Sequence, residues 1–270
     1  MWFTSDQSST RIFPGSFTGH LVQRPDPVSS YFTAAGRATS AGTLPAMHDC
    51  LAHHGYAALD LEYFDTPETP PDLVEIPIEY FSRAIDWLAE QDVVRADRVG
   101  TVAWSRGTEA QLLLAARDER VGAVVAYVAS IYAFPGLPGN EPGEGKSSAW
   151  SQDGEPVPYV PPYEGIEDDM DEPGGVRFRR TVDRAAADIL EQARLPVEDV
   201  RGPVLFVSDG AAETSPSTRS AETAIDHLVE HEHPWPYEHR HYPNAGHAIT
   251  SPYPTDQRET NRSIRWHPRR

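Results

Sequence analysis

The sequence predicts an α/β fold built on a mostly parallel, doubly wound sheet. Short apolar segments alternate along the chain with segments of helical periodicity, an order typical of strand–helix–strand units. Each apolar segment is hydrophobic throughout instead of at every second position, which indicates strands covered on both faces. The length of 270 residues suits one large domain, or one domain with an inserted cap.

The predicted elements follow one another in a regular order from Leu44 onward. The helix that begins at Pro77 shows the pattern most clearly, because apolar residues recur at helical spacing and predict a buried stripe of Ile78, Phe81, Ile85 and Leu88. We predict strands over residues 56–61, 98–103, 121–129, 203–208 and about 237–242. We predict the other helices over about 45–54, around 112–114, over 181–194 and over about 217–231.

The chain divides into three predicted regions. Residues 1–43 form a poorly defined N-terminal segment with a possible first strand, and residues 44–253 form the α/β domain. Within that domain, residues of about 134–180 are dense in Pro, Gly, Asp and Glu and too long for an ordinary connection. We interpret them as a cap inserted over the sheet, with a disordered acidic stretch as the alternative. Residues 254–270 form a polar, basic tail.

The charge balance is strongly acidic. There are 41 Asp and Glu residues against 23 Lys and Arg residues, a formal net charge of -18, and Lys146 is the only lysine. Such a surface disfavours nucleic acids and anionic membranes as partners. Acidic residues spread over the whole length, with almost no lysine, favour a protein kept soluble in strong brine. The alternative is an ordinary acidic protein.

The sequence also indicates a cellular location. Cys50 is the only cysteine, so an internal disulfide is excluded and a reducing interior is expected. No segment has the apolar run needed to span a bilayer, and the first residues lack the features of a secretory signal. We therefore expect a cytoplasmic protein that needs no cofactor. Cys50 lies within a predicted helix and is expected to be a small core residue.

The most informative motif is Ala-Trp-Ser-Arg-Gly at residues 103–107. It follows a predicted strand, precedes a predicted helix and matches Gly-x-Ser-x-Gly with alanine in the first position. This is the pattern of a nucleophile elbow, in which a strained turn exposes the serine at the positive end of a helix dipole. It predicts the α/β-hydrolase fold with Ser105 as nucleophile and the backbone N–H of Arg106 as an oxyanion-hole donor. The alternative is a structural serine at a helix start.

His247 is the predicted general base. It lies in a loop after the last predicted strand, where the chain order Ser, acid, His of these hydrolases requires the histidine. Five other histidines gather nearby in the sequence, but they lie on a helix, at its end and on an alternating strand without an evident ligand frame. No metal site is therefore expected at His227, His231, His233, His239 and His241.

From about Leu44 to Tyr253 the chain resembles the C-terminal domain shared by acyl-CoA thioesterases and bile acid-CoA:amino acid N-acyltransferases. The matching segments are residues 75–81, the elbow at Ser105, and residues 148–150, 202–207 and 243–249. The last segment, which is followed by Pro252 and Tyr253, is the most specific. The resemblance implies attack of a serine or cysteine on an acyl-CoA thioester, with transfer of the acyl group to water or an amino acid. A serine at position 105 resembles the thioesterase branch, because the transferases carry a cysteine there.

The resemblance therefore implies an acyl-CoA thioester hydrolase of acyl-CoA and fatty acid metabolism, with small acyl-CoA or ester substrates. The alternatives are an amino acid N-acyltransferase, a general carboxylesterase, or a non-catalytic relative that binds acyl groups or a partner. Family members usually carry a β-sandwich domain ahead of this one, for which the chain leaves no room. The glycine-rich oxyanion loop is also reduced, at residues 36–42.

The triad acid is the main departure from the family pattern. The turn after the strand that ends at Ser208 should present an aspartate, but the matching position is Ala212. Asp209 or Glu213 would then replace it, and we favour Asp209 because it stands at the end of its strand.

A basic cluster of Arg177, Arg179 and Arg180 suggests a site for the phosphates of coenzyme A, or else a solvated helix start.

Overall fold

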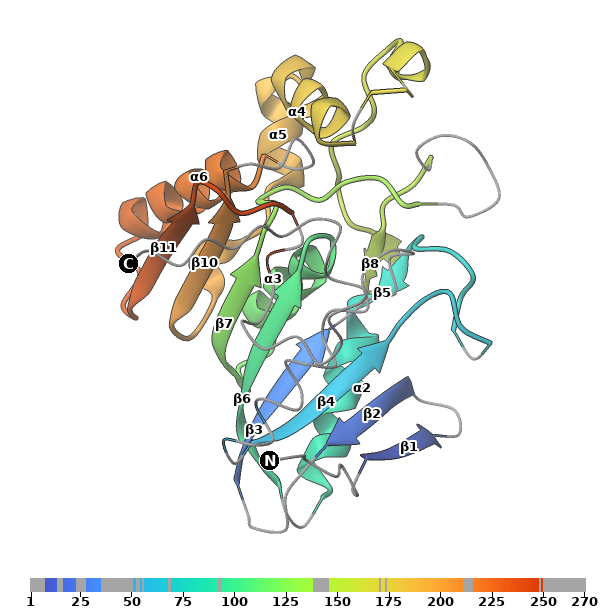
Figure 1. The fold of residues 1–270 in the computed structure, drawn as a ribbon, viewed down its shortest axis with the longest axis vertical. Helices are drawn as coiled ribbons and strands as arrows, with labels where there is room; N and C mark the ends of the chain where they lie inside the picture. Colours follow the sequence, from blue (N-terminus) through green and yellow to red (C-terminus); the bar gives the residue numbers. More distant parts are fainter. Residues whose placement is uncertain are drawn as a thin grey trace.

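The computed structural model describes residues 8–13, 17–22, 28–34, 51, 54, 56–67, 69–91, 94–137, 146–169, 171–172, 174–210, 216–247 and 249. An eight-stranded sheet forms its centre, in the spatial order β1-β2-β4-β3-β6-β7-β10-β11 (Figure 1). The strands are β1 (Ser8–Phe13), β2 (Phe17–Val22), β3 (Val28–Ala34), β4 (Ala57–Glu62), β6 (Val94–Trp104), β7 (Val121–Tyr127), β10 (Val204–Asp209) and β11 (Tyr237–Tyr242).

The sheet is mostly parallel, as predicted. β1 pairs with β2 and β2 with β4 in antiparallel fashion, whereas every pair from β4 to β11 across the sheet is parallel. Parallel strands point their carboxyl ends to one edge, so the loops after β6, β10 and β11 meet there. The mixed sheet with this strand order confirms the predicted α/β-hydrolase fold class.

The N-terminal segment contributes more strands than predicted. The sequence predicted at most one strand before residue 44, but β1, β2 and β3 all lie there, and β3 is central, between β4 and β6. Too few strands were predicted because residues 1–30 are polar and show no clear hydrophobic periodicity. Strand formation there depends on backbone pairing with β4 and β6, which are distant in sequence.

Helices α2 (Ile78–Ala89), α3 (Gly107–Arg117) and α6 (Ser217–Glu230) pack against the sheet. α2 starts after Pro77, and its predicted stripe is buried throughout: Ile78, Phe81, Ile85 and Leu88 are at most 1% exposed. α3 contacts α2 on one side and the short 3-10 helix η2 (Val197–Asp199) on the other, and η2 contacts α6. These helices therefore form one layer on the sheet.

The single helix predicted over 181–194 is wrong. Two helices occupy this part of the chain, α4 (Gly174–Arg184) and α5 (Ala187–Ala193), and Ala186 between them is extended with ψ 148°. Alanines at the break favour helix locally, so propensity predicted continuity. Tertiary packing overrides it, because residues of both helices bury side chains against Phe134 in a small second core.

The segment of about 134–180 packs partly in the main core and partly in the second core. The small sheet of β5 (Ile76–Pro77), β8 (Trp150–Gln152) and β9 (Glu155–Pro156) joins it to the start of α2. Trp150 is fully buried in the main core, with ring centroids 5.7 Å from Tyr63 and 6.2 Å from Phe81. The rest includes the 3-10 helix η1 (Ile166–Asp169) and the residues of the second core. Part of the predicted cap is thus anchored in the domain core.

Several expectations fall outside the described residues: the glycine loop 36–42, Cys50, Ala212, Glu213 and the tail 254–270. Of the helix predicted over about 45–54, only Leu51 and His54 are described. Among the described residues, no helix combines the length and apolar character needed to cross a bilayer.

Candidate active site

Ser105 lies in the tight turn between β6 and α3, at the carboxyl edge of the sheet. Its φ is +52°, a left-handed conformation that a serine adopts at a cost in strain. The turn is held on both sides: Ser105 N–H donates to the Tyr127 carbonyl at 3.0 Å, and the Ser105 carbonyl accepts from Thr108 N–H at 2.9 Å and Thr108 Oγ1 at 2.6 Å. This is the geometry of a nucleophile elbow.

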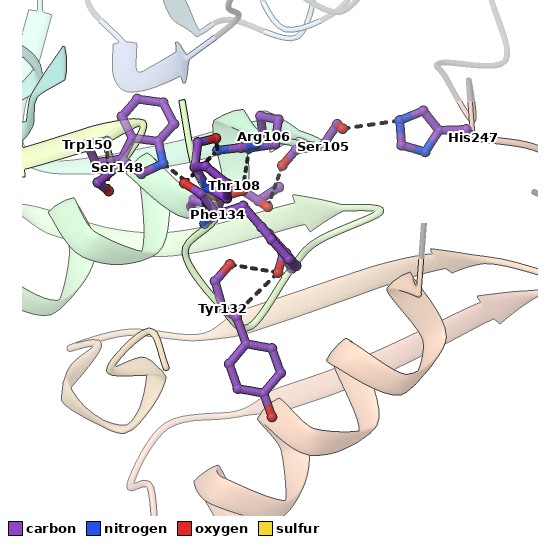
Figure 2. Close-up of polar contacts among 11 residues, drawn as sticks. Ser105, Arg106, Thr108, Tyr132, Phe134, Ser148, Trp150 and His247 are labelled. Carbon is purple, nitrogen blue, oxygen red and sulfur yellow. Dashed lines mark hydrogen bonds and ion pairs between the residues drawn. The ribbon is translucent and has the colours of Figure 1, made fainter. Parts of the chain in front are cut away.

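His247 approaches the same point from the loop after β11. Its Nε2 lies 3.1 Å from Ser105 Oγ (Figure 2). Hydrogen-bond reach between nucleophile and base is the requirement for activation of a serine. Two side chains that are 142 positions apart therefore meet at one edge of the sheet.

Trp104 positions His247 from the strand side. Its indole Nε1–H donates to the His247 carbonyl at 2.8 Å, and the two ring centroids are 4.6 Å apart. Sequence reasoning missed this residue because it occupies a position that the elbow pattern leaves open. An aromatic residue beside a nucleophile is a weak signal, and only the fold brings it against the histidine.

Burial lowers the pKa of His247, and the negative charge of Asp209 partly opposes this by raising that pKa. The imidazole is therefore neutral at neutral pH, the form that accepts a proton. The same electrostatic interaction shows that the Asp209 carboxylate lies close enough to influence the histidine.

Asp209 ends β10 and is 4% exposed. One carboxylate oxygen, Oδ1, accepts a hydrogen bond from Ser217 Oγ at the start of α6. The other, Oδ2, is buried without a partner among the described residues, and so is Nδ1 of His247. Asp209 and His247, the two residues expected to form the acid–base pair, thus each have one buried polar atom without a partner among the described residues.

Gly210 allows the turn after Asp209 to pass close to the loop that carries His247. A Cβ at this position would lie 2.6 Å from Pro243 Cα and 2.8 Å from the Pro243 carbonyl oxygen. Contacts this short require backbone movement, so glycine is needed where the two loops cross. Gly210 N–H also donates to the Tyr242 carbonyl at 3.1 Å, which ties the turn to the end of β11.

Arg106 directs its side chain away from Ser105 and toward the segment after β7. Its guanidinium donates to the carbonyls of Phe134 at 3.1 Å and Pro135 at 3.0 Å, and its Nε lies 2.6 Å from Glu109 Oε1 (Figure 2). Only its backbone is therefore available to the site. Arg106 is the N-cap residue of α3, and the N–H groups at this end have no partner within the helix.

Glu109 is a fully buried carboxylate on α3, one turn after Ser105. Its Oε2 accepts from Trp150 Nε1–H at 2.9 Å and from Phe134 N–H at 3.2 Å. Burial raises the pKa of Glu109, and the charge of Arg106 is the largest opposing effect. This network was not predicted; the one available signal was an acidic residue shortly before the apolar run of α3.

The remaining candidates lie on α4 and on α6. Arg180 pairs with Asp169 at 2.5 Å and with Glu172 at 3.6 Å, so acidic neighbours already engage one member of the proposed phosphate-binding cluster. Among the described residues, a group of side chains that could hold a metal ion lies on α6 and at its end: atoms of His227, Glu230 and His231 lie within 4.8 Å of one another. The expectation of no metal site was based on the histidines and did not consider Glu230.

The model of the family described as "BAAT / Acyl-CoA thioester hydrolase C terminal" matches residues 76–266. The mouse acyl-coenzyme A amino acid N-acyltransferase 2 is 30% identical over 205 residues, which are 75% of this chain and 45% of that protein. The mouse peroxisomal succinyl-coenzyme A thioesterase is 26% identical over 213 residues, 78% of this chain and 47% of that protein. The chain thus spans about half the length of these relatives.

Solved structures show the same fold. An α/β hydrolase from Penicillium sp. sh18 superposes with a TM-score of 0.54 at 14% sequence identity, covering 90% of this chain and 91% of that chain. At this identity the similarity concerns the fold alone.

Proposed function

The chain belongs to the BAAT / acyl-CoA thioester hydrolase C-terminal family, and from this premise we propose that it is a serine hydrolase that cleaves acyl-CoA thioesters through an acyl-enzyme. The observation that carries the proposal is the pairing of a strained serine, Ser105 with φ +52°, and His247 Nε2 at 3.1 Å from its Oγ. The names of the relatives, a thioesterase and an N-acyltransferase of coenzyme A thioesters, suggest the substrate class.

In the proposed mechanism His247 removes the proton of Ser105 as Oγ attacks the thioester carbonyl. The tetrahedral oxyanion is stabilised by the backbone N–H of Arg106 and the N-terminal end of α3. Collapse breaks the carbon–sulfur bond, and His247 returns the proton to the departing thiolate of coenzyme A. A water molecule, activated by the same histidine, then hydrolyses the acyl-serine.

Asp209 is the proposed acid. It would orient His247 and stabilise its charged form, as the acid of a Ser-His-Asp triad does. Support comes from the charge of Asp209, which raises the pKa of His247, and from the unpaired buried atoms Asp209 Oδ2 and His247 Nδ1. A hydrogen bond between these two atoms would satisfy both. No such bond is present among the described residues, so the proposed triad requires the two loops to bring these atoms into contact.

Transfer to an amino acid is the second candidate, because an amino acid N-acyltransferase matches at 30% identity. The two activities share the acyl-enzyme and differ in the acceptor. Release of free acid from an acyl-CoA without glycine or taurine supports hydrolysis, whereas product that forms only with an amino acid present supports transfer.

Covalent labelling by a fluorophosphonate at high salt tests the nucleophile. We expect the wild type to be labelled and to release thiol from a short acyl-CoA, and Ser105→Ala to lose both properties. Ser208→Ala is the matched control, because Ser208 Oγ also lies against an imidazole, 2.7 Å from His239 Nε2, but is buried on β10. It should still label. An unlabelled, inactive wild type would instead indicate a non-catalytic relative.

A further inference from the structure

A second group of chemically capable side chains lies on α6. His227, Glu230 and His231 are spaced by three and four residues, so they share one face of the helix. One ligand-type atom from each lies within 4.8 Å of the others. His227 is half-buried, whereas Glu230 and His231 are exposed, so the group is accessible from solvent.

The hydrogen bond of His231 leaves its second ring nitrogen available to bind a metal. Its Nδ1 lies 2.9 Å from the carbonyl oxygen of His227. A carbonyl only accepts hydrogen bonds, so in this contact Nδ1 must carry the proton and donate it. The lone pair of the neutral ring then resides on Nε2. A backbone carbonyl that fixes the ring and its tautomer in this way is the usual support of a metal-binding histidine.

The surroundings favour a cation. The group lies in the last turn of α6, where the helix dipole presents its negative end.

This end of α6 is remote from the proposed active site. His233, two residues beyond the group, is buried and its Nε2 lies 3.2 Å from the Gly202 carbonyl, just before β10 begins. Asp209 is at the opposite end of the same strand. The group therefore lies at the amino edge of the sheet, whereas Ser105 and His247 lie at the carboxyl edge.

We propose that His227, Glu230 and His231 form a binding site for a divalent transition-metal ion of the zinc class. Two imidazoles and one carboxylate are ligands that zinc accepts, and water would complete a tetrahedral shell. The ion would cross-link the last turn of α6 and so stabilise the fold, without a part in catalysis.

Calorimetric titration of the EDTA-treated protein with Zn²⁺ tests the proposal. The buffer contains KCl and millimolar Mg²⁺, because Mg²⁺ occupies any site that consists of carboxylates alone. We expect one Zn²⁺ per chain and a higher melting temperature with zinc. His231→Gln and Glu230→Gln, both at exposed positions, should each weaken binding at least tenfold. The matched control is His239→Gln with His241→Gln, which removes two histidines held at Ser208 and should leave binding unchanged.

Absence of Zn²⁺ binding, displacement by Mg²⁺, or equal affinity in all variants would overturn the proposal. Far-ultraviolet circular dichroism of each EDTA-treated variant checks that it is folded; should His231→Gln fail to fold, Glu230→Gln decides the question. Labelling of Ser105 does not depend on this site, so failure here and failure of the hydrolase proposal are separate results.

Discussion

At the scale of single residues, the site depends on backbone strain and on a few hydrogen bonds between distant loops. Ser105 adopts φ +52°, Trp104 binds the His247 carbonyl, and Gly210 lets two loops cross within van der Waals contact. None of these contacts is strong by itself. Together they place Ser105, Asp209 and His247, which follow or end β6, β10 and β11, at one edge of the sheet.

Asp209→Asn tests the proposed acid. The substitution removes the charge that raises the pKa of His247, so that pKa should fall further and the acid limb of the pH profile should move to lower pH. In the proposed triad kcat/KM should fall by about 10⁴-fold, as in a serine protease that loses its acid. The measurement is kcat/KM for a short acyl-CoA from pH 4 to 8.

Glu213→Gln is the control for this experiment. It should leave both the rate and the acid limb unchanged. The opposite pattern, with loss in Glu213→Gln and none in Asp209→Asn, would assign the acid to Glu213. If both variants kept wild-type activity, neither carboxylate would be the acid.

Trp104→Phe tests how His247 is held. Phenylalanine keeps an aromatic ring against the imidazole but removes the N–H that donates to the His247 carbonyl at 2.8 Å. We expect kcat to fall about tenfold, equivalent to ~1.4 kcal/mol, with KM nearly unchanged because the substitution alters the support of His247 and keeps the aromatic ring. Trp87→Phe on α2, away from the site, is the control. A rise in KM at constant kcat would contradict a positioning role.

At the scale of elements, helix α3 joins the turn of Ser105 to the segment after β7. Arg106 and Glu109, on its first turn, form a buried ion pair that also binds the backbone of Phe134 and Pro135 and the indole of Trp150. Every partner of this pair lies within 134–150. The helix that carries Ser105 and the start of the predicted cap are therefore coupled through one polar cluster.

Arg106→Met should destabilise the fold by about 3–5 kcal/mol, because it leaves Glu109 buried without its cation. Without Arg106 the pKa of Glu109 should rise further, so the loss of stability should be greater at high pH, where the carboxylate is charged. Urea unfolding at several pH values measures this. Arg117→Met is the control: Arg117 pairs with Glu79 at 2.8 Å at the surface, and such pairs contribute about 0–1 kcal/mol. Equal losses in the two variants would contradict the prediction.

At the scale of the whole molecule, net charge is the dominant feature. With a formal charge of -18, repulsion among carboxylates opposes the compact state. The described surface contains ion pairs, such as Arg219 with Asp183 at 2.5 Å. They leave the excess unchanged, because 23 cationic side chains cannot pair with all 41 carboxylates.

We predict that stability increases with salt. The Debye length falls from about 10 Å at 0.1 M to about 3 Å at 1 M, which screens the carboxylate repulsion. Thermal melts from 0.1 to 3 M KCl should therefore show a rising midpoint. Because chloride salts also screen the attractive pairs, a flat or falling midpoint would show that repulsion is not limiting and would remove the brine interpretation.

The sequence by itself determined the elements with strong local patterns. The stripe of α2, the apolar strands β4, β7 and β10 and the elbow at Ser105 follow from periodicity and from residue types that are specific to a backbone conformation. The alternation of apolar and helical segments, together with the elbow motif, was also sufficient to predict the fold class. These signals are local, so they can be detected without knowledge of the neighbours.

Only the tertiary structure decided which distant groups meet. β1, β2 and β3 form because they pair with strands far along the chain, and α4 and α5 separate because both pack on Phe134. The contacts Trp104–His247 and Glu109–Trp150 join residues 143 and 41 positions apart. The physical reason is that burial and hydrogen bonding depend on the partner supplied by another segment, and one sequence window does not contain that partner.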